Sequence, residues 1–111
     1  MSKIARVWYG DAPASRIDEY VEYVKRTGVR DLRATSGNLG VEVLTRVDGN
    51  IAEIVVISFW ESKEAIEQFA GQNISKAVYY PEDRDFLLTM EPEVVHYEVR
   101  LESQDRFETA E

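Results

Sequence analysis

Residues 40–66 read GVEVLTRVDGNIAEIVVISFWESKEAI, and they predict a β-hairpin that runs directly into a helix. Valine and threonine alternate with other side chains along residues 40–47, and the pair Asp48-Gly49 separates this run from a second β-branched run. An Asp-Gly pair between two such runs is a strong hairpin signal. A bulge at Asn50 would shift the pairing by one residue, so the cross-strand register stays open.

The end of the same stretch carries the start of a helix. Ser62 is a suitable N-cap, because its hydroxyl can accept a hydrogen bond from a backbone N–H of the first turn. The apolar residues that follow share one helical face, and they are Ala65, Ile66, Phe69 and Ala70. Gly71 interrupts the pattern, so we expect a short amphipathic helix that ends there.

The N-terminal part of the chain predicts a strand followed by a longer helix. Residues 4–9 are β-branched and aromatic, and a turn signal follows them. Asp11 is the expected N-cap, with Pro13 in the first turn. Apolar residues then recur at helical spacing as far as Gly28, which is the expected helix stop. The polar residues 29–38 are expected to form a surface loop.

The C-terminal part predicts one more short helical piece and a last strand. Apolar residues at helical spacing indicate the helical piece over residues 74–78, and Pro81 would end it. The last strand is expected over residues 94–101. We expect a single domain over residues 1–103 and a polar tail over residues 104–111.

The resulting order β-α-β-β-α-β is that of an α+β, ferredoxin-like fold, in which a four-stranded antiparallel sheet carries its helices on one face. The third strand is apolar on both faces, since Ile54 and Val56 point one way while Val55, Ile57 and Phe59 point the other. A homodimer that packs sheet against sheet would cover the open face. The alternative is a one-sided sheet with scattered exposed valines.

Composition excludes several classes of partner. The chain has 111 residues with 21 acidic and 13 basic side chains, and its formal charge of -8 disfavours both nucleic acid and anionic membranes. No cysteine is present, which removes disulfides and thiolate chemistry. No segment approaches the roughly 20 apolar residues that cross a bilayer. We expect a soluble, cytoplasmic protein.

Three segments carry a resemblance to a known family. The segments FWESKEAIEQF (59–69), SKAVYYPEDRDFLL (75–88) and VVHYEV (94–99) resemble the antibiotic biosynthesis monooxygenase family of the dimeric α/β-barrel superfamily. The resemblance extends over about residues 3–101. It implies a homodimer of ferredoxin-like domains joined through their sheets, each with a cleft between sheet and helices. The fold itself hosts many chemistries, so it constrains structure better than reaction.

Trp60 has two compatible interpretations. A tryptophan between a strand and a helix N-cap is usually a core residue whose indole N–H is hydrogen-bonded. The resemblance implies that the same residue lines a substrate pocket. In the heme-degrading branch of the family this tryptophan acts with a strand asparagine and a histidine iron ligand. Here the histidine position falls on Tyr79 and the asparagine position falls near Ala5 or Arg6, so heme degradation is not expected.

The cofactor-free oxygenase branch needs a dry, oriented pocket and a base or hydrogen-bond acceptor for a phenolic or quinol-like substrate. The candidate catalytic residues are Trp60, Tyr79 and His96. The candidate residues for binding a small aromatic or apolar ligand are Arg6, Trp8, Phe59 and Tyr80. Each has a structural alternative: the lone histidine could be a surface or dimer-contact residue, and the aromatic residues could belong to the core. We expect no cofactor and no metal site.

Other catalytic patterns are absent from the sequence. No serine lies in a G-x-S-x-G context, and the glycines of TSGNLG lack the lysine of a phosphate loop. The acidic run Glu82, Asp83 and Asp85 is expected to be a solvated loop. Two function classes remain. One is a cofactor-independent monooxygenase acting on an aromatic substrate, and the other is a non-catalytic dimeric barrel that binds a small ligand.

Overall fold

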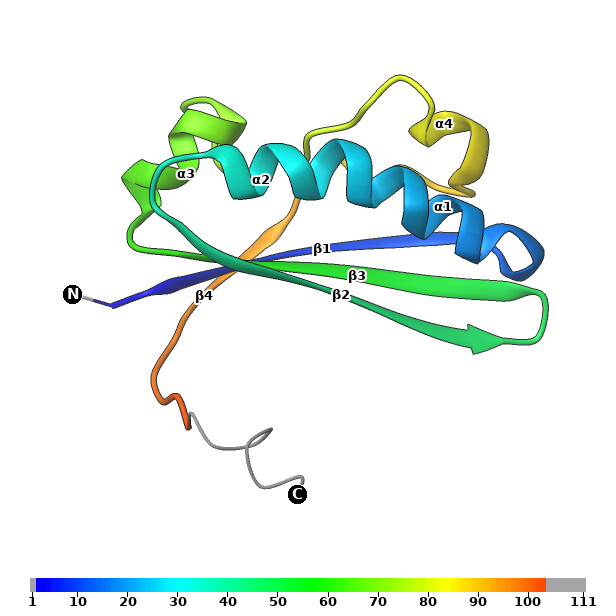
Figure 1. The fold of residues 1–111 in the computed structure, drawn as a ribbon, viewed down its shortest axis with the longest axis horizontal. Helices are drawn as coiled ribbons and strands as arrows, with labels where there is room; N and C mark the ends of the chain where they lie inside the picture. Colours follow the sequence, from blue (N-terminus) through cyan, green and yellow to red (C-terminus); the bar gives the residue numbers. More distant parts are fainter. Residues whose placement is uncertain (1, 104–111) are drawn as a thin grey trace.

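Four antiparallel strands form one sheet in the order β2-β3-β1-β4 (Figure 1). The computed structural model of the chain describes residues 2–103. The strands are β1 (Ile4–Pro13), β2 (Asn38–Asp48), β3 (Ile51–Trp60) and β4 (Val95–Glu98). This topology, with helices in the connections β1 to β2 and β3 to β4, confirms the expected ferredoxin-like α+β fold. The polar tail expected over residues 104–111 lies outside the described residues.

The hairpin β2-β3 has a two-residue loop. Asp48 pairs with Ile51, so Gly49 and Asn50 form the turn, and Gly49 has a positive φ of 64°. A primed hairpin turn requires this left-handed backbone, which glycine adopts without a steric penalty. The register therefore contains no bulge at Asn50. The irregularity lies at the other end of β2, between Asn38 and Gly40.

Strand β1 is longer than expected and continues through the predicted turn and N-cap. Asp11 pairs with Glu53 of β3, and its carbonyl accepts a hydrogen bond from the backbone N–H of Leu88 at 2.8 Å. These long-range backbone bonds outweigh the local capping preference of an aspartate. The prediction of a helix that begins at Asp11 was therefore wrong. Pro13 ends the strand instead.

The first helical segment continues past the predicted stop at Gly28. It starts with a 3-10 turn (Ala14–Arg16), followed by α1 (Ile17–Val24), a π-helical turn (Lys25–Val29) and α2 (Arg30–Ala34). Gly28 has no positive φ and does not end the helix. The π turn shifts the helical phase, which keeps the apolar stripe on the sheet, and Leu32 is buried there. The prediction of a loop over residues 29–38 was accordingly wrong for residues 29–34, and Asn38 already belongs to β2.

The second helical region matches the sequence in its first part only. Helix α3 (Lys63–Ala70) begins after Ser62, whose hydroxyl accepts a hydrogen bond from the N–H of Ala65 at 3.2 Å, and ends at Gly71 with φ 85°. The helical piece expected over residues 74–78 is not formed.

Residues 74 and 75 form a turn, Lys76 pairs with Glu93 in an isolated antiparallel bridge, and backbone hydrogen bonds of this segment go to residues 92–94. The N–H of Ala77 donates to the carbonyl of Pro92 at 2.9 Å, and the N–H of Val94 donates to that of Ser75 at 2.8 Å. A one-turn helix α4 (Asp83–Phe86) follows, and β4 is shorter than the strand expected over residues 94–101.

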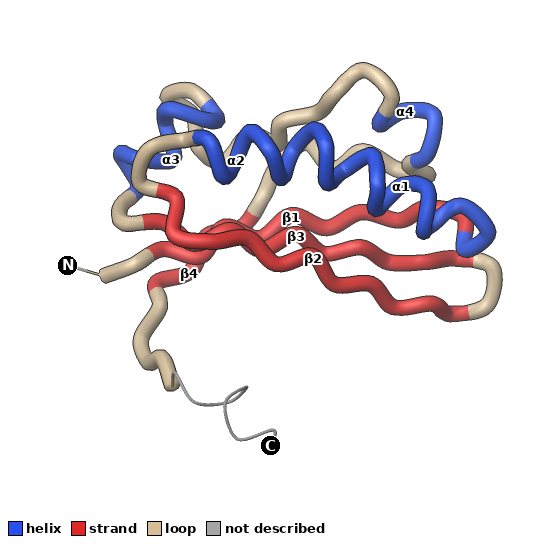
Figure 2. Tube along the Cα trace, viewed as in Figure 1, coloured by secondary structure: helices blue, strands red, loops and turns tan. Residues whose placement is uncertain are grey.

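All helices lie on one face of the sheet (Figures 1 and 2). Along β3 the helix-facing side chains are buried, and they are Ala52, Ile54, Val56, Ser58 and Trp60. The alternate residues Val55, Ile57 and Phe59 are only half-buried. No helix among residues 2–103 covers this open face, and its exposed apolar side chains include Tyr9, Leu44, Ile51, Val95 and Tyr97. The two-sided apolar pattern read from β3 is therefore present in the structure.

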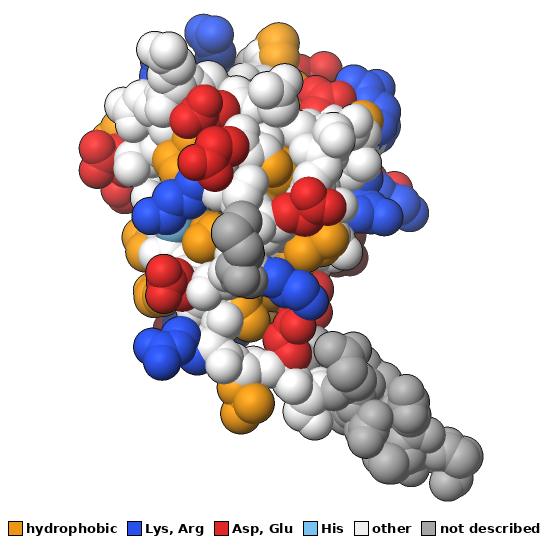
Figure 3. Space-filling model, turned by 90° about the vertical axis from the view of Figure 1, so that its left-hand side faces the viewer, with side chains coloured by type: hydrophobic (Ala, Val, Ile, Leu, Met, Phe, Trp, Pro, Cys, Tyr) orange, Lys and Arg blue, Asp and Glu red, His pale blue; other side chains and the backbone are white. Residues whose placement is uncertain are grey.

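The end of the molecule that Figure 3 shows has no strong segregation of charge. Acidic and basic side chains are interspersed with small hydrophobic patches on that end of the molecule. Within residues 2–103, no helix has the length and apolar character needed to cross a membrane.

Candidate functional site

A cavity lies between the helical layer and the sheet. The cavity has a volume of about 70 Å³, which is larger than the space that one water molecule needs. Its apolar wall combines both helical regions with the sheet and includes Trp8, Val24, Leu32, Val56, Phe69 and Val94. Its polar wall includes Arg6, Thr27, Ser58, Tyr79, Tyr80 and Asp83. An apolar enclosure with a few polar groups is the usual form of a small-molecule site.

Trp8 and Tyr79 form an aromatic corner of this cavity. The indole N–H of Trp8 donates to the hydroxyl of Tyr79 at 3.1 Å, and the rings meet edge to face with centroids 6.1 Å apart. The Tyr79 hydroxyl in turn donates to the carbonyl of Glu91 at 2.6 Å. Burial raises the pKa of Tyr79 above its usual value. The phenol is therefore neutral and already uses its proton.

Gly10 makes room for the Trp8 indole. A Cβ atom at Gly10 would lie 2.6 Å from Cη2 of Trp8, which is too close for any side chain. Gly10 lies within β1 rather than in the turn that its sequence context indicated. Its role is thus to let the indole fold back over the strand and form the cavity wall.

Arg6 is a buried cation in the cavity wall. It is 4% exposed, and it donates to the carbonyl oxygen of Ile74 and, at 3.0 Å, to that of Lys76. The guanidinium carbon lies 5.7 Å from the ring centroid of Phe69. Among residues 2–103, no carboxylate forms an ion pair with Arg6. Desolvation lowers the pKa of Arg6 to about 10, so it stays protonated at neutral pH.

His96 lies beside Arg6, in the paired position on the neighbouring strand β4. Its Nε2 is 3.3 Å from Nη1 of Arg6, and because an arginine can only donate, Nε2 is the acceptor and the imidazole is neutral. Burial, then the positive charges of Arg6 and Lys63, lower the pKa of His96. His96 does not line the cavity itself, so it contacts this site through Arg6.

Trp60 belongs to the core and supports the wall from behind. It is fully buried, its indole N–H donates to Oγ of Ser58 at 2.8 Å, and its ring lies 6.5 Å from that of Phe69. Ser58 and Phe69 line the cavity, whereas Trp60 does not. The structure therefore favours the packing interpretation of Trp60. Ser58 was missed, although a serine on the buried side of an apolar strand is an unusual residue.

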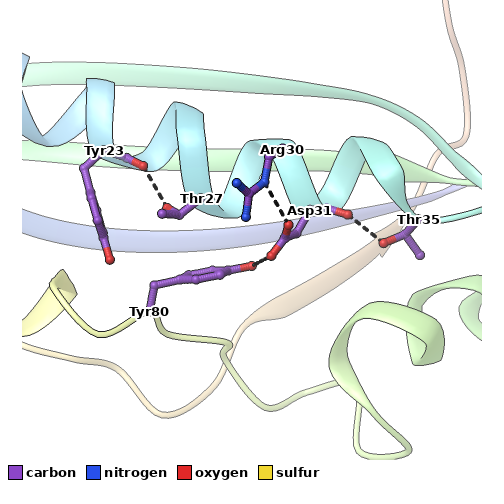
Figure 4. Close-up of polar contacts among 6 residues, drawn as sticks. All are labelled: Tyr23, Thr27, Arg30, Asp31, Thr35 and Tyr80. Carbon is purple, nitrogen blue, oxygen red and sulfur yellow. Dashed lines mark hydrogen bonds and ion pairs between the residues drawn. The ribbon is translucent and has the colours of Figure 1, made fainter.

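Tyr80 and Asp83 join the segment after α3 to the first helical region. The Tyr80 hydroxyl donates to Oδ2 of Asp31 at 2.7 Å (Figure 4), and its backbone N–H donates to Oδ2 of Asp83 at 2.6 Å. Burial, together with Asp31, raises the pKa of Tyr80. Asp83 is 5% exposed and also accepts from Tyr20 at 2.8 Å. The expectation of a solvated acidic loop was thus wrong for Asp83, because buried donors hold its carboxylate.

The cavity brings together four of the seven predicted site residues: Arg6, Trp8, Tyr79 and Tyr80. Trp60 and His96 lie directly behind its wall. Phe59 is on the opposite face of the sheet, where it pairs with Ala5 and Gly40, and it is not part of the cavity. Period-two alternation separates Phe59 from Ser58 and Trp60.

The residues present do not fit a heme in the manner of the heme-degrading branch. Tyr79, at the position expected for an iron ligand, has its hydroxyl engaged by Trp8 and Glu91, and burial disfavours the phenolate that would bind ferric iron. Within the described part of the chain, no cluster of three or more His, Cys, Asp or Glu side chains could hold a metal ion.

The sequence and the fold were compared with those of known proteins. The sequence model of the antibiotic biosynthesis monooxygenase family matches residues 10–79. No curated protein matches the sequence. A candidate antibiotic biosynthesis monooxygenase from Bacillus cereus has a similar solved structure, with a TM-score of 0.67, 17% identity, and coverage of 94% of this chain and 99% of that chain.

Two further solved structures share the fold. A candidate antibiotic biosynthesis monooxygenase from Nitrosomonas europaea matches with a TM-score of 0.63 and 11% identity, covering 89% of this chain and 91% of that chain. A heme-degrader from Mycobacterium tuberculosis, solved with two hemes bound in its active site, matches with a TM-score of 0.58 and 17% identity. The match covers 91% of this chain and 99% of that chain. At these identities the likeness establishes the fold alone.

Proposed function

The chain belongs to the antibiotic biosynthesis monooxygenase family, and we propose that it is a cofactor-independent monooxygenase that oxidises a small quinol- or phenol-like substrate with O2. The observation that carries this proposal is the cavity between sheet and helices. Its aromatic side chains Trp8, Phe69 and Tyr79 offer flat surfaces to a flat substrate, and Arg6 supplies a buried positive charge.

The protein's contribution to such a reaction is orientation and exclusion of water. In the overall reaction one oxygen atom of O2 becomes a carbonyl of the product and the other leaves as water, with both hydrogen atoms supplied by the substrate. A cavity that fixes the ring against Trp8 and Tyr79 reduces the entropic cost of the encounter with O2. A dry wall protects the carbanion-like intermediate from protonation by solvent.

A second candidate function is binding without catalysis. In the cavity wall, the hydroxyls of Tyr79 and Tyr80 already donate to Glu91 and Asp31, and the Asp83 carboxylate accepts from Tyr20 and Tyr80. None of these groups is an unengaged general base. A barrel that only stores or carries a small aromatic ligand would need no such base.

The assembly that we infer is a homodimer joined through the open sheet faces. Tyr9, Leu44, Val95 and Tyr97 are between 44% and 55% exposed on that face, and half-buried Val55, Ile57 and Phe59 lie between them. An apolar surface of this extent is uncommon on a monomer. Each chain would keep its own cavity, since the cavity lies on the other side of the sheet.

Oxygen uptake measured beside ligand binding tests the proposed function. The purified protein is titrated with simple quinols and anthrone-like compounds, and O2 consumption is followed for each compound that binds. We expect catalytic O2 uptake that Tyr79→Phe reduces and that Tyr9→Phe, a matched change on the open sheet face, leaves unaltered. Saturable binding without O2 uptake would support the non-catalytic alternative, and absence of any aromatic binding would overturn both.

A further inference from the structure

Arg6 and Ser58 lie side by side on the helix-facing side of the sheet, in paired positions on β1 and β3. We propose that these two residues form an anion-binding site in the cavity wall, and that the ligand binds as an aromatic oxyanion, an ionised phenol or enol. This inference rests on the proposed function in so far as it takes the cavity to be the ligand site.

The first support is an excess of hydrogen-bond donors at this end of the cavity. A guanidinium has five N–H donors, and those of Arg6 are used by Ile74, Lys76 and His96 through Nη1 and Nη2 only. Within residues 2–103 its Nε–H donates to no acceptor, and because no fully buried side-chain nitrogen or oxygen there is left unpaired, this N–H must reach accessible space. The Ser58 hydroxyl accepts from Trp60, and within the described part of the chain it donates to no acceptor, so its proton is available to a ligand. Donors without acceptors are suited to an oxygen that carries negative charge.

The second support is the free-energy cost of burying the Arg6 guanidinium without a counter-charge. The Arg6 residue is 4% exposed, so its charge is largely desolvated, yet the partners of its guanidinium are two carbonyls, one imidazole and the face of Phe69. None of these carries a negative charge. Buried charges in proteins are normally paired, because desolvation of a lone ion is expensive. A ligand anion would supply the missing counter-charge.

None of the titratable groups described around Arg6 supplies the negative charge that the anion would bring. His96 approaches from β4 as a neutral acceptor, and Tyr79 and Tyr80 approach from the segment before α4 as neutral phenols. Asp83 of α4 is the one carboxylate in the described cavity wall, but it forms no ion pair with Arg6 and is held by Tyr20 and Tyr80. The anion would therefore meet a positive end of the cavity at Arg6.

The aromatic part of the assignment comes from the rest of the wall. Trp8, Phe69 and Tyr79 surround the space next to Arg6, and Phe69 contacts the guanidinium directly. An oxyanion attached to a flat ring would place its charge on Arg6 and Ser58 while its ring contacts these side chains. The ionised form of a quinol is also the form that gives electrons to O2, so the same contact would select the reactive species.

The test uses 4-nitrophenol, whose ionised form is yellow and whose neutral form is colourless. At a pH just below the pKa of the free phenol, we expect addition of the protein to increase the yellow absorbance saturably, because the bound molecule is ionised. The neutral isostere 4-nitrotoluene should bind more weakly by about tenfold or more. Tighter binding of 4-nitrobenzoate than of 4-nitrophenol would contradict the choice of an ionised phenol.

Arg6→Gln should abolish the colour change and bring the affinities for 4-nitrophenol and 4-nitrotoluene together. Arg84→Gln is the matched control, because it removes one positive charge from an exposed position on α4. Ser58→Ala should weaken 4-nitrophenol binding without altering that of 4-nitrotoluene. If Arg6→Gln does not fold, the anion site is still tested by Ser58→Ala and by the affinities of the wild type for the two ligands.

The outcomes separate this inference from the proposed function. Equal affinity of the wild type for 4-nitrophenol and 4-nitrotoluene, with no change of colour, would overturn the anion site while leaving an aromatic cavity in place. Binding of neither compound would overturn the cavity as a ligand site, and with it the proposed function.

Discussion

The indole N–H of Trp60 donates to the Ser58 hydroxyl at 2.8 Å, and this bond links a fully buried core residue to the wall of the cavity. The two residues are on the same side of β3, two positions apart. Trp60 thus acts on the cavity through Ser58 and Phe69 rather than by contact with a ligand.

Trp60→Phe should lower the free energy of unfolding by roughly 1–2 kcal/mol, because it leaves a partial cavity and removes a buried hydrogen bond. Trp8→Phe, at a half-buried position in the cavity wall, should cost less stability and more ligand affinity. Chemical denaturation of both variants, together with a ligand titration, measures the contrast. Equal stability of Trp60→Phe and the wild type would show that the indole is not a core residue.

Leu44→Lys should prevent formation of the proposed dimer, because Leu44 is 46% exposed on the open sheet face and lies in a row with Val55 and Tyr9. A charge at that position would be desolvated in a sheet-to-sheet interface. Val47→Lys is the matched control, since Val47 is exposed on the same strand but points to the other face. Light scattering coupled to gel filtration checks both, and a wild type that elutes as a 12.8 kDa monomer would refute the dimer.

His96 should make the protein less stable as the pH falls below about 6.5, the ordinary pKa of histidine in an unfolded chain. Burial and Arg6 lower the pKa of His96 in the folded state. The unfolded chain therefore binds more protons between the two pKa values, and stability rises with pH across that window. His96→Gln should flatten this part of the curve of unfolding free energy against pH. An unchanged slope in the variant would assign the pH dependence to other groups.

Heme titration should give no sharp Soret shift at one heme per chain, since the Tyr79 hydroxyl is engaged by Trp8 and Glu91. Tyr79→His supplies the comparison, because an imidazole at that position is a better ligand for iron. We expect this variant to bind heme more tightly than the wild type does. A tight stoichiometric complex of the wild type, lost in Tyr79→Phe, would make Tyr79 an iron ligand.

The parts of the fold that the sequence predicts correctly are those specified by local chemistry. The β2-β3 hairpin follows from alternation and a turn pair, and α3 follows from the Ser62 cap and the Gly71 stop. The wrong predictions occur where contacts between residues far apart in the sequence determine the secondary structure. Asp11 stays in a strand because β3 and Leu88 bond its backbone, and the helix passes Gly28 because packing of Leu32 continues beyond it.

The cavity was only partly predictable for the same reason. The resemblance indicated Tyr79 and Tyr80, and their aromatic character is visible in the sequence. Asp83 was read as part of a solvated run because its partners, Tyr20 and the Tyr80 N–H, come from other parts of the fold. Ser58 could have been found from the alternation of β3, which places a hydroxyl among buried apolar side chains.

Intermolecular nuclear Overhauser effects between bound 4-nitrophenol and labelled methyl groups test most directly the claim that the cavity is the ligand site. The methyl groups of Val56, Val94 and Leu32 line the cavity, whereas those of Leu44 and Val95 are on the open sheet face. We expect the ring protons of the ligand to show contacts to the first set only. Contacts to the second set without the first would place the ligand on the open face and contradict the account.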